Sequence, residues 1–159
     1  MHYLVRLIVE ADTVEEANIQ ADSVMMDLVE WHEFDWYTMQ DMESRWDDCW
    51  KPIRLATKKA QAMVQETMQE QRTVFDELMA TIRFMMSHYN DEQIFNEEFK
   101  QEMPGRYLSR YQFSKASGYN ADAGQLYDTN GNAITNQRDL DAYLKEPKRL
   151  WVVQVDCHN

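Results

Sequence analysis

The feature that most constrains the fold is the run 53–89, which contains no glycine or proline. Its apolar residues recur at helical spacing, so we predict a long helix that begins at Pro52, because proline suits the first helical position. Such a helix is about 55 Å long, which is long for a chain of this size. In the segment 65–73 the one large apolar residue is Met68, which predicts either a bend or a partner, such as a second copy in a homodimer. Residues 91–103 predict another short helix that ends at Pro104.

The N-terminal residues predict a strand, a helix and a second strand. Residues 3–10 alternate, which places Tyr3 and every second residue after it on an apolar face and the charged residues on the other face. Thr13 and Glu16 have the spacing of a capping box, and the helix that they start extends to about Trp31. Residues 34–39 predict the second strand. The apolar face of the helix is expected to comprise Ala17, Ala21, Val24, Met25 and Leu28.

The C-terminal residues predict a hairpin, a helix and a strand. Asn130-Gly131 is typical of a tight turn, so we expect a hairpin over 125–134. Asn136 caps a helix over 137–146, and residues 150–155 form a buried strand. The fold class is therefore α+β, with a small antiparallel or mixed sheet and a long helical insertion. We expect a single domain over 1–159, with its sheet core in 1–39 and 119–159 and the insertion in 52–103.

Acidic residues are concentrated at the start of the chain. Residues 1–50 carry thirteen acids and two bases, Arg6 and Arg45, and the whole chain has a formal net charge of −12. Such a field repels nucleic acid and anionic membranes and attracts basic surfaces, so we expect no direct nucleic-acid binding and no membrane binding. Two cysteines are too few for a disulfide framework, and the N-terminus lacks the pattern of a signal peptide. These features predict a cytoplasmic protein.

Three short stretches resemble a family of small uncharacterised phage and prokaryotic proteins. The first stretch is Phe34-Asp35-Trp36-Tyr37 leading to Arg45-Trp46. The second is Leu126-Tyr127-Asp128 with Asn130-Gly131, and the third runs from Trp151 to His158. In that family an F-D-[WY] strand precedes a G-G-R-W turn, and the chain ends in W-V-x-P-V-D-x-H. This chain departs from the pattern at Glu43-Ser44 and at Gln154. The resemblance covers about half the chain and implies a phage-like provenance but no activity.

The last strand carries a candidate catalytic pair. Asp156 and His158 alternate onto one face, where a carboxylate can hold an imidazole in one tautomer, and Asp35 can join them. This set fits a small metal-dependent hydrolase, although a polar strand end in solvent explains it better. No second histidine has metal-ligand spacing, and the motifs of nucleophilic, phosphate-binding and zinc sites are absent from the sequence. We therefore predict no enzyme activity, no metal and no cofactor.

A basic segment follows the acidic one and predicts an alternative ligand site. Lys51, Arg54 and Lys58 surround the expected helix start, and Arg45 and Trp46 precede them. Together these residues can clamp and stack a nucleotide, which would make the protein a sponge for a nucleotide signal. Pairing of these bases with the acidic first fifty residues is the simpler explanation.

The leading hypothesis is a non-enzymatic acidic binding protein. Carboxylates on one side of a protein can imitate phosphates and block a basic channel, and Trp residues are common anchors of binding surfaces. The partner would be a host defence protein with a basic nucleic-acid-binding surface, and the chain would be phage-encoded. The competing explanation for the acidity is solubility. The residues predicted to bind the partner are Asp41, Glu43, Asp47, Asp48, Trp46 and Trp50.

Overall fold

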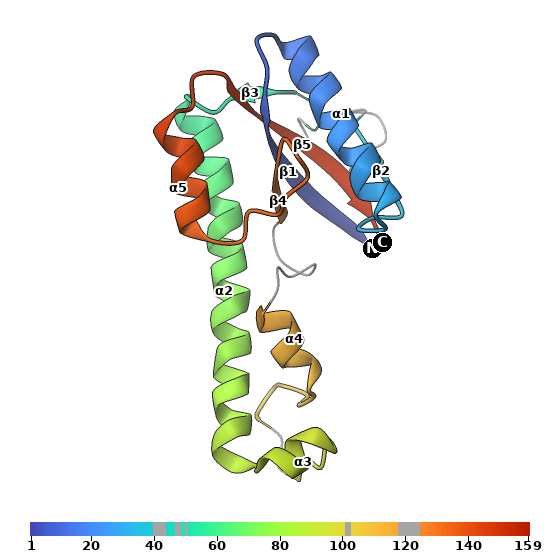
Figure 1. Ribbon diagram of the computed structural model, residues 1–159, viewed down its shortest axis with the longest axis vertical. Coiled ribbons are helices and arrows are strands. Elements are labelled where there is room, and N and C mark those ends of the chain that lie inside the picture. The colour runs from blue at the N-terminus through green and yellow to red at the C-terminus, as the bar shows by residue number, and fades with distance from the viewer. Residues whose placement is uncertain (40–43, 47–48, 50, 101–102, 118–124) are drawn as a thin grey trace. The chain divides into compact units, whose positions relative to one another are not determined.

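A computed structural model describes residues 1–39, 44–46, 49, 51–100, 103–117 and 125–159. Its sheet contains β1 (His2–Glu10), β2 (Trp36–Thr38), β3 (Ile53–Arg54), β4 (Gln125–Asp128) and β5 (Leu150–His158). The strand order is β2-β5-β1-β4, and β3 also pairs with β5 (Figure 1). β1 is parallel to β4 and antiparallel to β5, while β2 and β3 are antiparallel to β5. The predicted α+β fold with a mixed sheet is therefore confirmed.

The helices are α1 (Val14–Glu30), α2 (Lys58–His88), α3 (Asp91–Phe95), α4 (Tyr111–Ser117) and α5 (Gln137–Lys145). The chain forms two compact units, and α2 contributes residues to both of them. Unit 1 comprises Met1–Gln69 and Gly124–Asn159, and unit 2 comprises Glu70–Ala123. The expected limits of the helical insertion, 52 and 103, stay a prediction.

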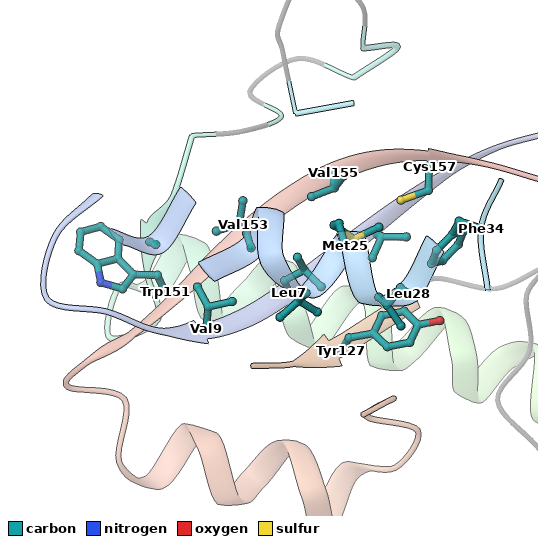
Figure 2. Packing of buried hydrophobic residues seen from close by; sticks show 14 of the residues in the cluster. Leu7, Val9, Met25, Leu28, Phe34, Tyr127, Trp151, Val153, Val155 and Cys157 are labelled. Carbon is teal, nitrogen blue, oxygen red and sulfur yellow. The ribbon is translucent and has the colours of Figure 1, made fainter. Parts of the chain in front are cut away.

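One face of the sheet in unit 1 is covered by α1. The predicted capping box is present, because the Thr13 side chain accepts from the Glu16 amide and Glu16 accepts from the Thr13 amide. In the helix that follows the capping box, the five predicted apolar residues of α1 are all buried. They pack on alternate residues of β1 and β5, among them Leu7 and Val153, and on Phe34 and Tyr127 (Figure 2). The packing confirms both the helix and its inward face.

The other face of the sheet is also covered, which corrects one expectation. The start of α2 and α5 contribute Ala60, Val64 and Leu140 to a second core with Ile8 of β1. Arg6, expected on a charged face of β1, is buried in this layer. It donates to the Gln154 side chain and to the Met63 carbonyl. It also donates to the Thr67 hydroxyl and the Glu66 carboxylate of α2. An alternating strand therefore has two buried faces here, because a helix with its own polar acceptors covers the second one.

The predicted long helix is present as α2, but it begins later in the sequence than the predicted start at Pro52. Pro52 precedes the short strand β3, and α2 begins at Lys58, where the Thr57 hydroxyl accepts from the Ala60 amide at 3.3 Å. From there α2 runs without interruption for 31 residues, about 46 Å, so the polar segment 65–73 does not break it. Pairing of Ile53 with Val152 explains the difference, since the first apolar residues of the run are used by the sheet.

Three further boundaries differ from expectation. α3 ends at Phe95 rather than near residue 103, and Glu97 follows it with a positive φ of 55°. β4 ends at Asp128, and the second arm of the predicted hairpin is not a strand: it pairs with β4 through an isolated antiparallel bridge between Tyr127 and Ala133 and a hydrogen bond from the Ile134 amide to the Leu126 carbonyl at 2.8 Å. β5 extends beyond residue 155 to His158, so the candidate pair on the last strand lies within the sheet.

Unit 2 has a small core. Met85 and Tyr89 at the end of α2 are buried with Leu108, and half-buried side chains such as Phe84, Phe99 and Phe113 pack against them. α4 (Tyr111–Ser117) lies in a stretch for which the sequence predicted no element. The start of α4 is held by a hydrogen bond between residues three positions apart, in which the Ser109 amide donates to the Gln112 side chain at 2.8 Å.

Candidate functional site

The outer side of α1 carries an unusual combination of exposed acidic and apolar side chains. We call Glu15, Ile19, Asp22, Met26 and Glu30 the α1 outer face, because these residues follow one side of the helix at spacings of three and four. All five are exposed. The exposed fractions of Ile19 and Met26 are 66% and 60%, although most apolar side chains of this size in unit 1 are buried. The inner side of α1 is fully used by the core, so the outer face is available for another role.

The electrostatics of the α1 outer face are one-sided. Residues 7–44 contain no lysine or arginine. Within the part of the chain that the structure describes, no basic side chain forms an ion pair with Glu15, Asp22 or Glu30. Three carboxylates therefore lie along one helix side without a neighbouring cation, and they attract positive charge on an approaching molecule.

Asp22 is held in position by the second strand of the chain. The Tyr37 hydroxyl donates to the Asp22 carboxylate at 2.6 Å. Burial raises the pKa of Tyr37 above its ordinary value, and the hydrogen bond and charge of Asp22 raise it further. The hydroxyl thus stays protonated and holds the Asp22 carboxylate in one position.

Of the six residues of the predicted acidic binding site, the structure describes Trp46. Asp41, Glu43, Asp47, Asp48 and Trp50 fall outside the described residues. Trp46 is half-buried, and its amide donates to the Ser44 hydroxyl at 3.0 Å. The acids of α1 were counted in the sequence as part of the general charge but not proposed as a site. The signal that could have located them is the recurrence of Ile19 and Met26 on the side opposite the predicted apolar face.

The predicted catalytic residues meet at one end of the sheet, with a partner that the sequence did not indicate. Asp156 is fully buried, and its carboxylate accepts from the Arg45 amide at 2.9 Å. Its other oxygen lies 2.8 Å from Nδ1 of His2, which faces His158 across the β1–β5 register. Asp156 thus orients His2 rather than His158. Antiparallel pairing of the first and last strands of the chain would have revealed this histidine.

His158 belongs to the same strand-end cluster through its ring. It stacks on Trp36 with ring centroids 5.2 Å apart, and Nδ1 lies 3.9 Å from the Asp35 carboxylate. The His2 ring contacts both of these rings at an edge. Among the described residues, no group of three or more His, Cys, Asp or Glu side chains is placed to hold a metal ion. The cluster connects β1, β2 and β5.

Cys157 points away from this cluster into the core. Burial raises the pKa of its thiol, and the charges of Asp156 and Cys49 raise it further. The thiol therefore stays protonated and behaves as a small apolar group.

The predicted nucleotide clamp is not gathered in one place. The Arg45 amide binds Asp156, whereas Arg54 pairs with Trp151 in the β3–β5 register and lies 4.3 Å over the indole ring. Trp151 and Asp156 are five positions apart along β5, which corresponds to about 17 Å. Arg54 also donates to the Asp12 and Lys148 carbonyls. Lys51 and Lys58 are exposed, and the nucleotide site stays a prediction.

Comparison with known proteins assigns the chain to a family without assigning an activity. Residues 1–159 match the model of the family described as Domain of unknown function (DUF7995). No curated protein and no solved structure matches the chain. In the described residues, no helix has the length and apolar character needed to cross a membrane.

Proposed function

The chain belongs to the DUF7995 family, and we propose that it is a non-enzymatic binding protein that covers a basic surface of another protein. The observation that carries this proposal is the α1 outer face, where exposed carboxylates and two exposed apolar side chains share one helix side and, among the described residues, no basic side chain forms an ion pair with these carboxylates. Protein surfaces that recognise a partner combine apolar anchors with charge complementarity in this way.

The partner proposed is a nucleic-acid-binding protein. A surface that evolved to hold phosphates is rich in Lys and Arg, and a cation-free acidic helix competes for it by the same electrostatics. With the phage-like provenance implied by the sequence resemblance, the setting is inhibition of a host defence protein in the host cytoplasm. Enzymatic alternatives have less support, because Asp156 is fully buried and bound to a backbone amide.

The test is capture of the partner by the full-length protein. The tagged protein is recovered from defence-carrying host cells, and native mass spectrometry identifies any fixed-ratio complex. The variant Glu15→Lys/Glu30→Lys reverses two exposed carboxylates of the α1 outer face. The matched control Glu70→Lys/Glu146→Lys makes the same change in net charge at exposed residues away from α1.

We expect the α1 variant to lose the complex or to bind at least about tenfold more weakly, and the control to bind as the wild type does. Rising salt should weaken wild-type binding more than binding by the α1 variant, since the variant has fewer ionic contacts to screen. Equal binding by both variants would show that α1 is not the binding surface. Absence of any complex, with or without the variants, would reject the binding function.

A further inference from the structure

The α1 outer face has the spacing of a helix-pairing seam. Glu15, Ile19, Asp22 and Met26 are separated by four, three and four residues, so the apolar pair and the acidic pair each repeat after seven. Seven-residue repeats place side chains on the line where two helices touch at a shallow angle. Resting on the binding function proposed above, we infer that this face docks one basic amphipathic helix of the partner protein, with Ile19 and Met26 as its apolar anchors.

Charge and polarity favour this occupant over the alternatives. A second copy of this chain would bring the same cation-free face, so an α1–α1 contact would place carboxylates of like charge together. An anionic membrane is repelled by Glu15, Asp22 and Glu30 for the same reason. A helix with Lys or Arg opposite these carboxylates, and with apolar side chains seven residues apart opposite Ile19 and Met26, satisfies both kinds of group.

The docking face is already rigid before a partner arrives. Ala17, Ala21 and Leu28 on the inner side of α1 are buried in the core, and the capping box fixes its first turn. Tyr37 holds the Asp22 carboxylate at 2.6 Å. Binding therefore requires ordering of the partner helix alone, which lowers the entropic cost of association.

The inference is tested with a synthetic probe and the full-length protein. The probe is a lysine–leucine peptide about three heptads long, with leucines at the first and fourth heptad positions. A second peptide has the same composition in shuffled order and cannot form an apolar stripe. Isothermal titration calorimetry gives Kd for both peptides, and circular dichroism verifies that each protein variant keeps its helix content.

The decisive variant is Ile19→Ser/Met26→Ser, and its matched control is Met86→Ser, which replaces a methionine that is equally exposed but lies on α2. We expect the stripe peptide to bind the wild type about tenfold more tightly than the shuffled peptide does, and the double variant to lose that preference. The control Met86→Ser should keep the preference for the stripe peptide over the shuffled peptide.

The outcomes separate this inference from the binding function. Equal affinity for the two peptides, unchanged affinity in Ile19→Ser/Met26→Ser, or no binding of either peptide at low salt would each overturn the helix-docking inference. If the helix-docking inference fails in this way but a partner is still captured from cells, and Glu15→Lys/Glu30→Lys weakens its binding, the binding function is supported. The partner is then recognised without the apolar anchors Ile19 and Met26.

Discussion

Two arginines, one in each unit, make the same contacts with α2. Arg6 donates to the Met63 carbonyl and to the hydroxyl of Thr67, and Arg106 donates to the Glu77 carbonyl and to the hydroxyl of Thr81. In both places the threonine hydroxyl also donates to that same carbonyl, four residues earlier in the helix. In both places a carboxylate of α2 completes an ion pair, Glu66 with Arg6 and Glu77 with Arg106.

The two arginines differ in their surroundings. The Arg6 side chain is 9% exposed and also donates to Gln154, whereas the Arg106 side chain is 31% exposed. Unit 1 has buried layers on both faces of its sheet, but the hydrophobic cluster of unit 2 within the described ranges is small, with Met85, Tyr89 and Leu108 as its buried members. The same hydrogen bonds are therefore worth more in unit 1, because water cannot replace them there.

The largest effect is expected from Arg6→Ala. The substitution removes charged donors from buried acceptors on Gln154 and Thr67, so we expect a loss of about 3 kcal/mol in the free energy of unfolding. Urea denaturation followed by tryptophan fluorescence measures it. A loss below that of Arg106→Ala would contradict the burial argument.

The next largest effect concerns the two glycines with positive φ. Gly131 has φ +75°, and a Cβ there would lie 3.0 Å from Trp31, so Gly131→Ala should cost about 2 kcal/mol. Gly105 in unit 2 has φ +76° with nothing within 4 Å of an added Cβ, so Gly105→Ala should cost about 1 kcal/mol from backbone strain alone. Urea denaturation measures both.

A double variant separates strain from steric clash. In the Trp31→Ala background, Gly131→Ala should cost no more than Gly105→Ala does in the wild type, because the clash is gone. If the cost at Gly131 stays the same without the indole ring, the ring contact does not limit this turn.

Arg106→Ala should have a smaller and local effect. We expect a loss of about 1.5 kcal/mol, confined to unit 2, because water can reach the partly exposed side chains of Arg106 and Glu77. Hydrogen exchange measured by mass spectrometry should show faster exchange in α3 and in the end of α2, with β1 unchanged. Faster exchange in β1 would mean that the two units do not open separately.

Acid should weaken unit 1 through the turn that follows β4. Burial raises the pKa of Asp128, but hydrogen bonds from Asn132, Asn130 and Tyr143 outweigh it, so the pKa is lowered in the folded state. A lowered pKa means that Asp128 contributes stability above its ordinary pKa of about 4, and that this contribution is lost as the pH falls through the folded-state value.

The substitution Asp128→Asn tests this assignment. It should cost about 1 kcal/mol at pH 7, because the amide group loses part of the acceptor capacity for Asn130, Asn132 and Tyr143. The difference from the wild type should shrink as the pH falls from 5 to 2, as urea denaturation at each pH shows. A difference that stays constant with pH would assign the acid sensitivity to another carboxylate.

The parts of the fold that were predicted correctly depend on short-range patterns. Thr13 and Glu16 form their capping box, Asn136 caps α5 by accepting from the Asp139 amide, and the apolar face of α1 is the buried one. Each of these signals involves residues a few positions apart, so no knowledge of the tertiary structure is needed to interpret them. Gly131 likewise has the positive φ that its turn motif implied.

The errors involve residues whose partners are far away in the sequence. The apolar residues at 53–55 fit a helix, but β5 pairs with Ile53 and Arg54 from a hundred residues away and makes them a strand. α4 lies in a segment without periodicity, because local hydrogen bonds rather than a repeated apolar face define it. The α1 outer face was missed for a different reason: Ile19 and Met26 recur opposite the predicted apolar face, and that local signal was not used.

By itself, the sequence determined where α1, α5, β1 and β5 form, which side of α1 is buried, and that the acids of the first fifty residues outnumber their bases. Tertiary structure alone decided that Arg6 is a buried anchor of α2 and that Asp156 binds His2, a residue 154 positions away. The reason is physical. A local pattern states which side chains prefer to leave water, but the acceptor that permits a charge or a histidine to be buried is supplied by another part of the chain.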